Sequence, residues 1–241
     1  MDLLLLSNSR GPDGAYLTHA LEAIAEIAAG RKHAVFVPYA GVTIGWDDYT
    51  RNVVDALAPL GIDVASVHRA DDAQALVRQA EIVLVGGGNT FNLLKCCRET
   101  GLLPLIAARV RAGAAYIGWS AGANLAGPTI RTTNDMPIVD PGGFDALGLV
   151  PFQLNPHFTD ALPAGHQGET RTQRLAEFLV ANPDARVVGL PEGDWLRVGD
   201  ADTHLHGPWP ARIFAAGQPI VSVDSPARLD PHLLTKPSIP G

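Results

Sequence analysis

Two kinds of apolar pattern alternate along the first half of the chain. Short, nearly continuous apolar runs are typical of strands buried on both faces, and they occupy residues 3–7, 34–38, 64–68, 82–85 and 115–118. Between these runs, apolar residues recur every three or four positions, as in amphipathic helices, over residues 17–29, 46–60, 71–79, 90–98 and 103–111. This alternation predicts an α/β fold with a mostly parallel central sheet and helices on both faces.

The pattern becomes less regular after residue 120. One more helix is predicted over residues 170–180, and short strands are predicted at 186–190, 195–198, 204–206, 213–215 and 220–223. We expect these strands to pair antiparallel and to lie at an edge of the sheet. The segment 226–241 has four prolines in sixteen residues and little periodicity. We therefore expect a single α/β domain over residues 1–225 and a loosely ordered C-terminal tail over 226–241.

Charge and composition narrow the class of protein. The net charge is -7, from 18 basic and 25 acidic residues, so the surface repels phosphate backbones and nucleic acid is not an expected partner. No dense run of Lys and Arg favours an anionic membrane, and no apolar stretch approaches the length of a membrane span. The N-terminus lacks a basic segment, and the two cysteines, Cys96 and Cys97, are adjacent. These features predict a cytoplasmic protein without a disulfide framework.

The sequence Gly-Trp-Ser-Ala-Gly at residues 118–122 is the strongest chemical signal. It follows a predicted strand and precedes small residues that can begin a helix, which is the context of a nucleophile elbow. The glycines leave room for the sharp turn that projects the Ser120 hydroxyl. The same turn directs the backbone N–H of Ala121 toward a developing oxyanion. The alternative interpretation is a glycine-rich turn that only packs a helix on the sheet.

A second glycine-rich segment, Gly-Gly-Gly-Asn-Thr at residues 86–90, follows the preceding predicted strand. Ligand sites of open α/β sheets lie at this edge, so the backbone N–H groups could complete an oxyanion hole. The segment lacks the Lys-Ser or Lys-Thr of a phosphate-binding P-loop. A plain turn is the alternative.

A nucleophilic serine requires a base and an acid that orients the base. Among the eight histidines, His157 stands out because Pro156 stiffens the chain before it, whereas His68 is a weaker candidate at a strand end. His204 and His206 would share a strand face, but no third metal ligand accompanies them, so no metal site is predicted. Asp135, in a polar loop, and Glu192, directly after a predicted strand, are both candidates for the acid.

These separated motifs together resemble the S51 family of serine peptidases, the α-aspartyl dipeptidases. The similarity runs from Leu3 to about Val223 and is densest at residues 86–91, 116–124, 129–141, 155–158 and 189–193. The resemblance implies a fold similar to class I glutamine amidotransferases, with serine in place of their cysteine. It also implies hydrolysis of dipeptides that begin with aspartate, with Ser120 as nucleophile and His157 as base. For the third member the resemblance allows Asp135 or Glu192, with Asp135 slightly favoured.

The chemistry of acyl transfer then predicts how such a site would act. The N–H groups of Ala121 and Gly88 would hold the oxyanion, and Asn89 would lie in the substrate-binding loop. Selection of aspartate requires a cation, and Arg171 at a predicted helix start is the candidate, with a surface ion pair as the alternative. The expected partner is a small peptide beginning with aspartate, and no cofactor is expected. A cyanophycinase-like peptidase and a non-catalytic binding module remain as alternatives, and the oligomeric state is not indicated.

Overall fold

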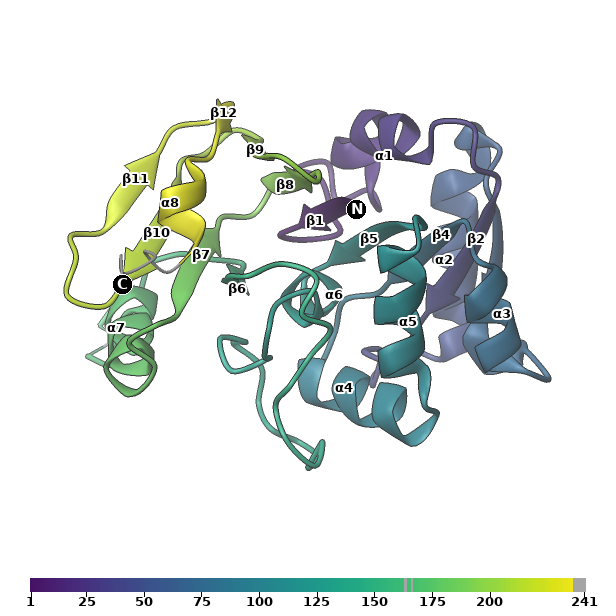
Figure 1. Ribbon diagram of the computed structural model, residues 1–241, viewed down its shortest axis with the longest axis horizontal. Coiled ribbons are helices and arrows are strands. Elements are labelled where there is room, and N and C mark those ends of the chain that lie inside the picture. The colour runs from purple at the N-terminus through teal and green to yellow at the C-terminus, as the bar shows by residue number, and fades with distance from the viewer. Residues whose placement is uncertain (163, 166, 236–241) are drawn as a thin grey trace, which may run out of the picture.

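The strands form two sheets in the computed structural model, which describes residues 1–235 except 163 and 166 (Figure 1). The larger sheet has the order β12-β9-β8-β1-β5-β4-β2-β3, and the smaller one β11-β10-β7-β6. The strands are β1 (Asp2–Leu6), β2 (His33–Val37), β3 (Asp63–Ser66), β4 (Ile82–Val85), β5 (Ala115–Trp119), β6 (Gln153–Pro156), β7 (Arg186–Leu190), β8 (Trp195–Val198), β9 (Thr203–His206), β10 (Ala211–Ala215), β11 (Val221–Val223) and β12 (Ala227–Arg228).

Helices connect most of the parallel strands. They are α1 (Leu21–Ala28), α2 (Trp46–Leu57), α3 (Ala73–Gln79), α4 (Thr90–Glu99), α5 (Leu102–Arg111), α6 (Ala121–Leu125), α7 (Arg171–Ala181) and α8 (Pro231–Leu234), with single 3-10 turns at Thr18–Ala20, Ala58–Leu60 and Val67–Arg69. Side chains that accept backbone N–H bonds fix several helix starts. Asp72, Asn89 and Thr170 cap α3, α4 and α7 in this way.

Five strands of the larger sheet, β1, β5, β4, β2 and β3, are parallel, and β8, β9 and β12 extend it antiparallel. Alternate residues of β1 enter different cores. Leu3 and Leu5 pack with α4 and α5, whereas Leu4 and Leu6 pack with α1 and α2. All four leucines are 0% exposed, so the strand is covered on both sides. The predicted mostly parallel sheet with helices on both faces is confirmed.

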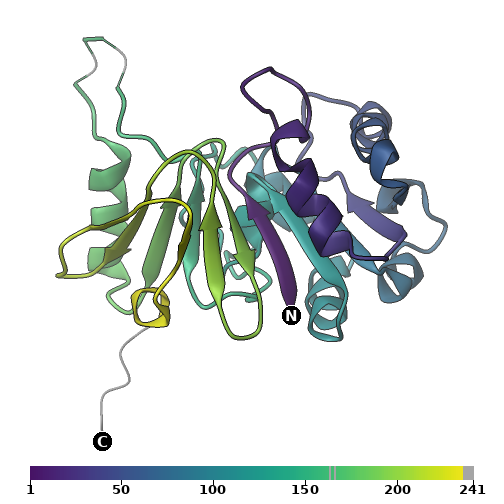
Figure 2. The ribbon, with the colours of Figure 1, turned by 90° about the horizontal axis from the view of Figure 1, so that it is seen from above.

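The late strands are divided between two places. β8 and β9 lie at the antiparallel edge, as predicted, but β7, β10 and β11 join β6 in the separate smaller sheet. β6 and β7 are parallel, with Pro156 opposite Leu190. Helix α7 packs on this sheet through Leu175 and Leu179, and Figure 2 shows it at the end of the molecule away from α2. The prediction that all of these strands lie at one edge of a single sheet was therefore incomplete, because the apolar runs do not encode which sheet each strand enters.

The start of the Pro-rich segment differs from the expectation of a loose tail. Residues Ala227–Arg228 pair with β9 and Pro231–Leu234 form α8. Leu229 and Leu234 are 1% and 5% exposed, so this part is anchored by burial of apolar side chains. The expectation was wrong for these residues, and residues 236–241 of the tail lie outside the described part of the chain.

Within the described residues, no helix is both long enough and apolar enough to cross a membrane.

Candidate active site

Four of the predicted site segments lie at the carboxyl ends of strands. Ser120 follows β5, the glycine segment follows β4, His157 follows β6, and Glu192 lies just after β7. β4 and β5 are neighbours in the larger sheet, and β6 and β7 are neighbours in the smaller one. The site therefore forms where the carboxyl edges of the two sheets meet.

Ser120 occupies a strained turn between β5 and α6. Its φ of 54° and ψ of -113° lie outside the regions that L-residues ordinarily adopt. The flanking glycines make the turn possible. A Cβ on Gly118 would lie 2.5 Å from the Gly122 carbonyl oxygen, and one on Gly122 would lie 2.1 Å from that of Val85. The strand, sharp turn and helix that the motif predicts are thus all present.

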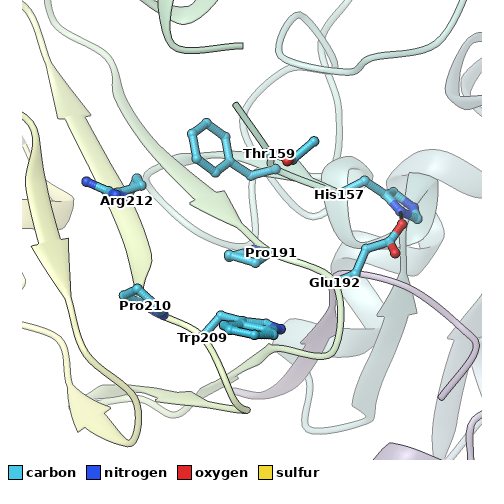
Figure 3. A pocket seen from close by; sticks show the side chains of 8 residues that line it. His157, Thr159, Pro191, Glu192, Trp209, Pro210 and Arg212 are labelled. Atoms are coloured by element: carbon cyan, nitrogen blue, oxygen red, sulfur yellow. Dashed lines mark hydrogen bonds and ion pairs between the residues drawn. The ribbon is translucent and has the colours of Figure 1, made fainter. Parts of the chain in front are cut away.

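His157 links the serine to a carboxylate. Its Nε2 lies 2.8 Å from Ser120 Oγ, and its Nδ1 lies 2.6 Å from Glu192 Oε1. The His157 and Glu192 side chains are 36% and 65% exposed, so the pair is open to solvent in this chain alone. Figure 3 shows Glu192 reaching the imidazole at the edge of a cavity of about 500 Å³.

Ser7 holds the two sheets together at this point, although the sequence analysis did not single it out. Its hydroxyl donates to the Leu190 carbonyl and accepts the backbone N–H of His157, both at 2.8 Å. Asn8, the next residue, accepts the backbone N–H of Gly193 at 2.8 Å. These contacts fix the backbone on both sides of the His157–Glu192 pair. The available signal was a pair of polar residues directly after the buried run of β1.

Asp135 lies apart from the hydrogen bonds of His157. Its Oδ2 accepts the Thr90 backbone N–H at 2.7 Å and the hydroxyls of Thr90 and Thr133 at 2.5 and 3.1 Å. It therefore sits at the N-terminus of α4, where the backbone favours a negative charge. The structure places Glu192, not Asp135, in contact with the imidazole.

The glycine segment approaches Ser120 closely. A Cβ on Gly87 would lie 2.9 Å from Ser120 Cβ, and Gly88 has a φ of +133° with no room for a side chain beside Ala40. Asn89 forms two hydrogen bonds at the start of α4. Its Oδ1 accepts from the backbone of Asn92 at 3.0 Å, and its Nδ2 donates to the Met136 carbonyl at 2.8 Å.

Tyr49 supports the glycine segment through a hydrogen bond, and the sequence analysis did not single it out. Its hydroxyl donates to the Gly87 carbonyl at 2.9 Å and accepts from Trp119 Nε1 at 3.0 Å. Burial raises the pKa of Tyr49, so the hydroxyl remains a donor. A Cβ on Gly86 would lie 2.5 Å from this hydroxyl, which explains why a glycine precedes Gly87.

A cavity of about 220 Å³ opens beside Ser120 and is lined by both Arg171 and Asp135. Arg171 is the first residue of α7, and its Nη1 donates weakly to the His157 carbonyl at 3.4 Å. Burial is the main cause that lowers the pKa of the Arg171 guanidinium, and the nearby charge of Arg174 lowers this pKa further. The Asp135 carboxylate raises it. The cavity thus presents one positive and one negative group next to the serine hydroxyl.

Within the described residues, no group of three or more His, Cys, Asp or Glu side chains is placed to hold a metal ion. His204 and His206 lie on one strand with ring centroids 6.4 Å apart, and His204 lies 3.2 Å from Asp202.

The chain is similar to known proteins in sequence and in fold. The sequence model of peptidase family S51 matches residues 3–206. Peptidase E of Salmonella newport (strain SL254) is 58% identical over 225 residues, which cover 93% of this chain and 98% of that protein. Peptidase E of Citrobacter koseri is 59% identical over the same coverage. A crystal structure of a peptidase from an acI-B1 Actinobacterium has the same fold, with a TM-score of 0.67 at 18% identity over 95% of this chain and 96% of that chain. The chain therefore belongs to peptidase family S51.

Proposed function

We propose that the protein is a serine dipeptidase that removes an N-terminal aspartate from dipeptides. The observation that carries this proposal is the small cavity at Ser120, which presents the Arg171 guanidinium and the Asp135 carboxylate together. An N-terminal aspartyl residue bears a carboxylate and an ammonium group a few bonds apart. Arg171 would bind the β-carboxylate, and Asp135 would accept from the α-ammonium group. The volume of about 220 Å³ suits one small residue.

The reaction follows from the hydrogen bonds around Ser120. His157 Nε2 accepts the Ser120 proton as Oγ attacks the peptide carbonyl carbon. The backbone N–H groups of Ala121 and Gly88 stabilise the oxyanion. The amine of the second residue leaves with the proton from His157. Water, deprotonated by the same imidazole, then attacks the aspartyl ester and restores the hydroxyl of Ser120.

Glu192 is the third member of the triad in this proposal. Its contact of 2.6 Å with Nδ1 holds the tautomer in which Nε2 is free to accept the serine proton. It also stabilises the imidazolium that forms during attack. Asp135, which the family resemblance favoured slightly, is assigned to substrate binding instead, because its bonded oxygen is held by Thr90 and Thr133.

A panel of three peptides tests the proposal. Asp-Leu should be hydrolysed, Asn-Leu should be a poor substrate because it lacks the carboxylate, and N-acetyl-Asp-Leu should be poor because it lacks the ammonium group. Release of free leucine by the purified protein is the measurement. Equal rates for Asp-Leu and Asn-Leu would contradict selection of aspartate, and equal rates for the acetylated and free peptides would contradict the role of Asp135.

A further inference from the structure

A second cavity, of about 640 Å³, opens at the same serine and histidine. It shares Ser120 and His157 with the cavity that contains Arg171, and no other lining residue. The cavity beside Glu192 also reaches His157, but Ser120 does not line it. A peptide that places its first residue in the small cavity and its scissile carbonyl at Ser120 can therefore extend its second residue into the larger one. Gly87 and Gly88 line this side, and the leaving amine would lie beside His157.

Apolar side chains gather around the larger cavity. Tyr16, Val42, Ile44 and Ile138 all line it. The side chains of Val42 and Ile138 are 54% and 51% exposed, and neither belongs to a core of the described residues. Exposed apolar side chains that converge on a catalytic serine indicate a surface for an apolar ligand group.

Arg10 is the only Lys or Arg among the described residues that line this cavity. It lies just beyond β1, whose last residue, Leu6, pairs with Trp119 next to Ser120. A short antiparallel bridge joins the backbones of Arg10 and Tyr16. The Arg10 guanidinium lies 5.9 Å from the centre of the Tyr16 ring. Arg10 Nη1 also donates to the Gly14 carbonyl at 2.8 Å. No carboxylate of the described residues forms a salt bridge with Arg10. Its charge is thus held in place and remains available to a ligand.

We propose that this cavity binds the leaving amino acid and that Arg10 binds its α-carboxylate, with the apolar wall receiving its side chain. The inference rests on the proposed function. A dipeptide carries a carboxylate directly after the second Cα, whereas a longer peptide carries a neutral amide there. Arg10 therefore favours dipeptides with an apolar second residue over longer peptides.

The test uses one substrate pair and one matched control. Asp-Leu and Asp-Leu-amide differ only in the terminal carboxylate, and both are measured with the wild type, Arg10→Ala, Arg10→Lys and Arg51→Ala. Arg51 pairs with Asp48 on the surface of α2 and does not line the cavity, so its removal changes the net charge equally. Arg10→Ala should raise KM for Asp-Leu by about tenfold and leave kcat unchanged, because the ion pair is the same in the ground state and the transition state.

The amide should show no such change, and its KM with the wild type should equal that of Asp-Leu with Arg10→Ala. Arg10→Lys should recover part of the loss, and Arg51→Ala should leave the ratio of the two KM values as in the wild type. Equal effects of Arg10→Ala on acid and amide, or no effect on either, would overturn the inference and leave the proposed function intact. A wild type that hydrolyses neither peptide would instead overturn the proposed function and this inference with it.

Discussion

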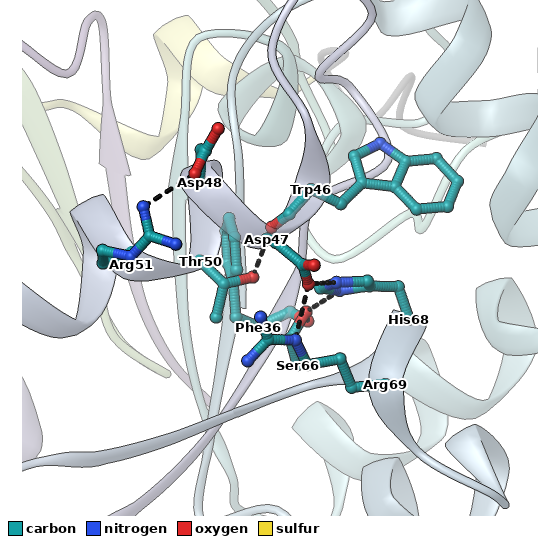
Figure 4. A network of polar contacts seen from close by, with 9 residues as sticks. All are labelled: Phe36, Trp46, Asp47, Asp48, Thr50, Arg51, Ser66, His68 and Arg69. Carbon is teal, nitrogen blue, oxygen red and sulfur yellow. Dashed lines mark hydrogen bonds and ion pairs between the residues drawn. The ribbon is translucent and has the colours of Figure 1, made fainter.

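Ser66, His68 and Asp47 form a second hydrogen-bonded series of serine, histidine and carboxylate, which can be compared with Ser120, His157 and Glu192. In the second series Ser66 Oγ lies 2.6 Å from His68 Nδ1, and His68 Nε2 lies 2.8 Å from Asp47 Oδ1 (Figure 4). The distances are similar to those at Ser120, but the two ring nitrogens exchange roles.

The backbone at the serine distinguishes the two series. Ser66 ends β3 in an extended conformation, with φ of -101° and ψ of 136°, and is 6% exposed. Its hydroxyl also reaches the Phe36 carbonyl at 3.3 Å. Ser120 has a positive φ, glycines on both sides and two cavities at its hydroxyl. A chain of hydrogen bonds is therefore not sufficient for catalysis, because the nucleophile also needs access to a substrate and donors for the oxyanion.

The largest expected effect comes from removing each serine in turn. Ser120→Ala should lower kcat for Asp-Leu by about 10⁶-fold, as expected when the nucleophile of a triad is lost. Ser66→Ala is the matched control and should keep the wild-type kcat, although loss of one buried hydrogen bond should lower the unfolding free energy by about 1 kcal/mol. Initial rates and urea titrations measure both. Comparable losses of activity from the two substitutions would remove the distinction between the series.

The two candidate acids give the next largest effect. Glu192→Gln should lower kcat by about 10⁴-fold, because glutamine cannot hold the required tautomer or stabilise the imidazolium. Asp135→Asn should lower kcat/KM for Asp-Leu by about 10²-fold through loss of a charged contact with substrate. Steady-state kinetics with both variants decide the assignment. A larger loss of kcat from Asp135→Asn would return the triad role to Asp135.

The apolar pattern of the chain was sufficient to predict the parallel core. Runs such as Leu3–Leu6 and Ile82–Val85 are buried on both faces, and local steric rules were sufficient to predict the turn at Ser120. These features depend on residues adjacent in sequence. The contact of His157 with Glu192 was not predictable from the sequence, because it depends on β6 pairing with β7 in a separate sheet.

The contacts of Ser7 with His157 and Leu190 were missed for the same reason. They join residues 150 and 183 positions apart in sequence, and only the meeting of the two sheets brings them together. The C-terminal segment shows the opposite error. Its prolines indicate a loose tail when read locally, yet Leu229 and Leu234 are buried against distant strands.

A smaller effect is expected when the arginine near each histidine, Arg69 near His68 and Arg171 near His157, is replaced. Arg69 donates to Asp47 at 2.6 Å within the second series, whereas Arg171 lines the cavity at Ser120. Arg171→Ala should lower kcat/KM for Asp-Leu by about 10²-fold, because the substrate carboxylate loses its partner, and should change Asn-Leu little. Arg69→Ala should change neither rate. An equal loss for Asp-Leu and Asn-Leu would show that Arg171 has a structural role and that aspartate is selected elsewhere.

The smallest expected effect is a dependence of stability on pH that arises from Asp47 in the second series. The hydrogen bond from Arg69, and then that from His68, lowers the pKa of Asp47 to about 2. An unfolded aspartate has a pKa of about 3.9, so the stabilisation is fully present above about pH 4 and is lost as the pH falls toward about 2. The wild type should therefore exceed Asp47→Asn in midpoint of urea unfolding at pH 7, and the difference should shrink at about pH 3. Because Asp47 is at the surface, the difference should be small. The value of kcat at pH 7 should be unchanged in Asp47→Asn. A difference in unfolding midpoint that stays constant from neutral to acid pH would mean that Asp47 acts through packing of α2 and not through its charge.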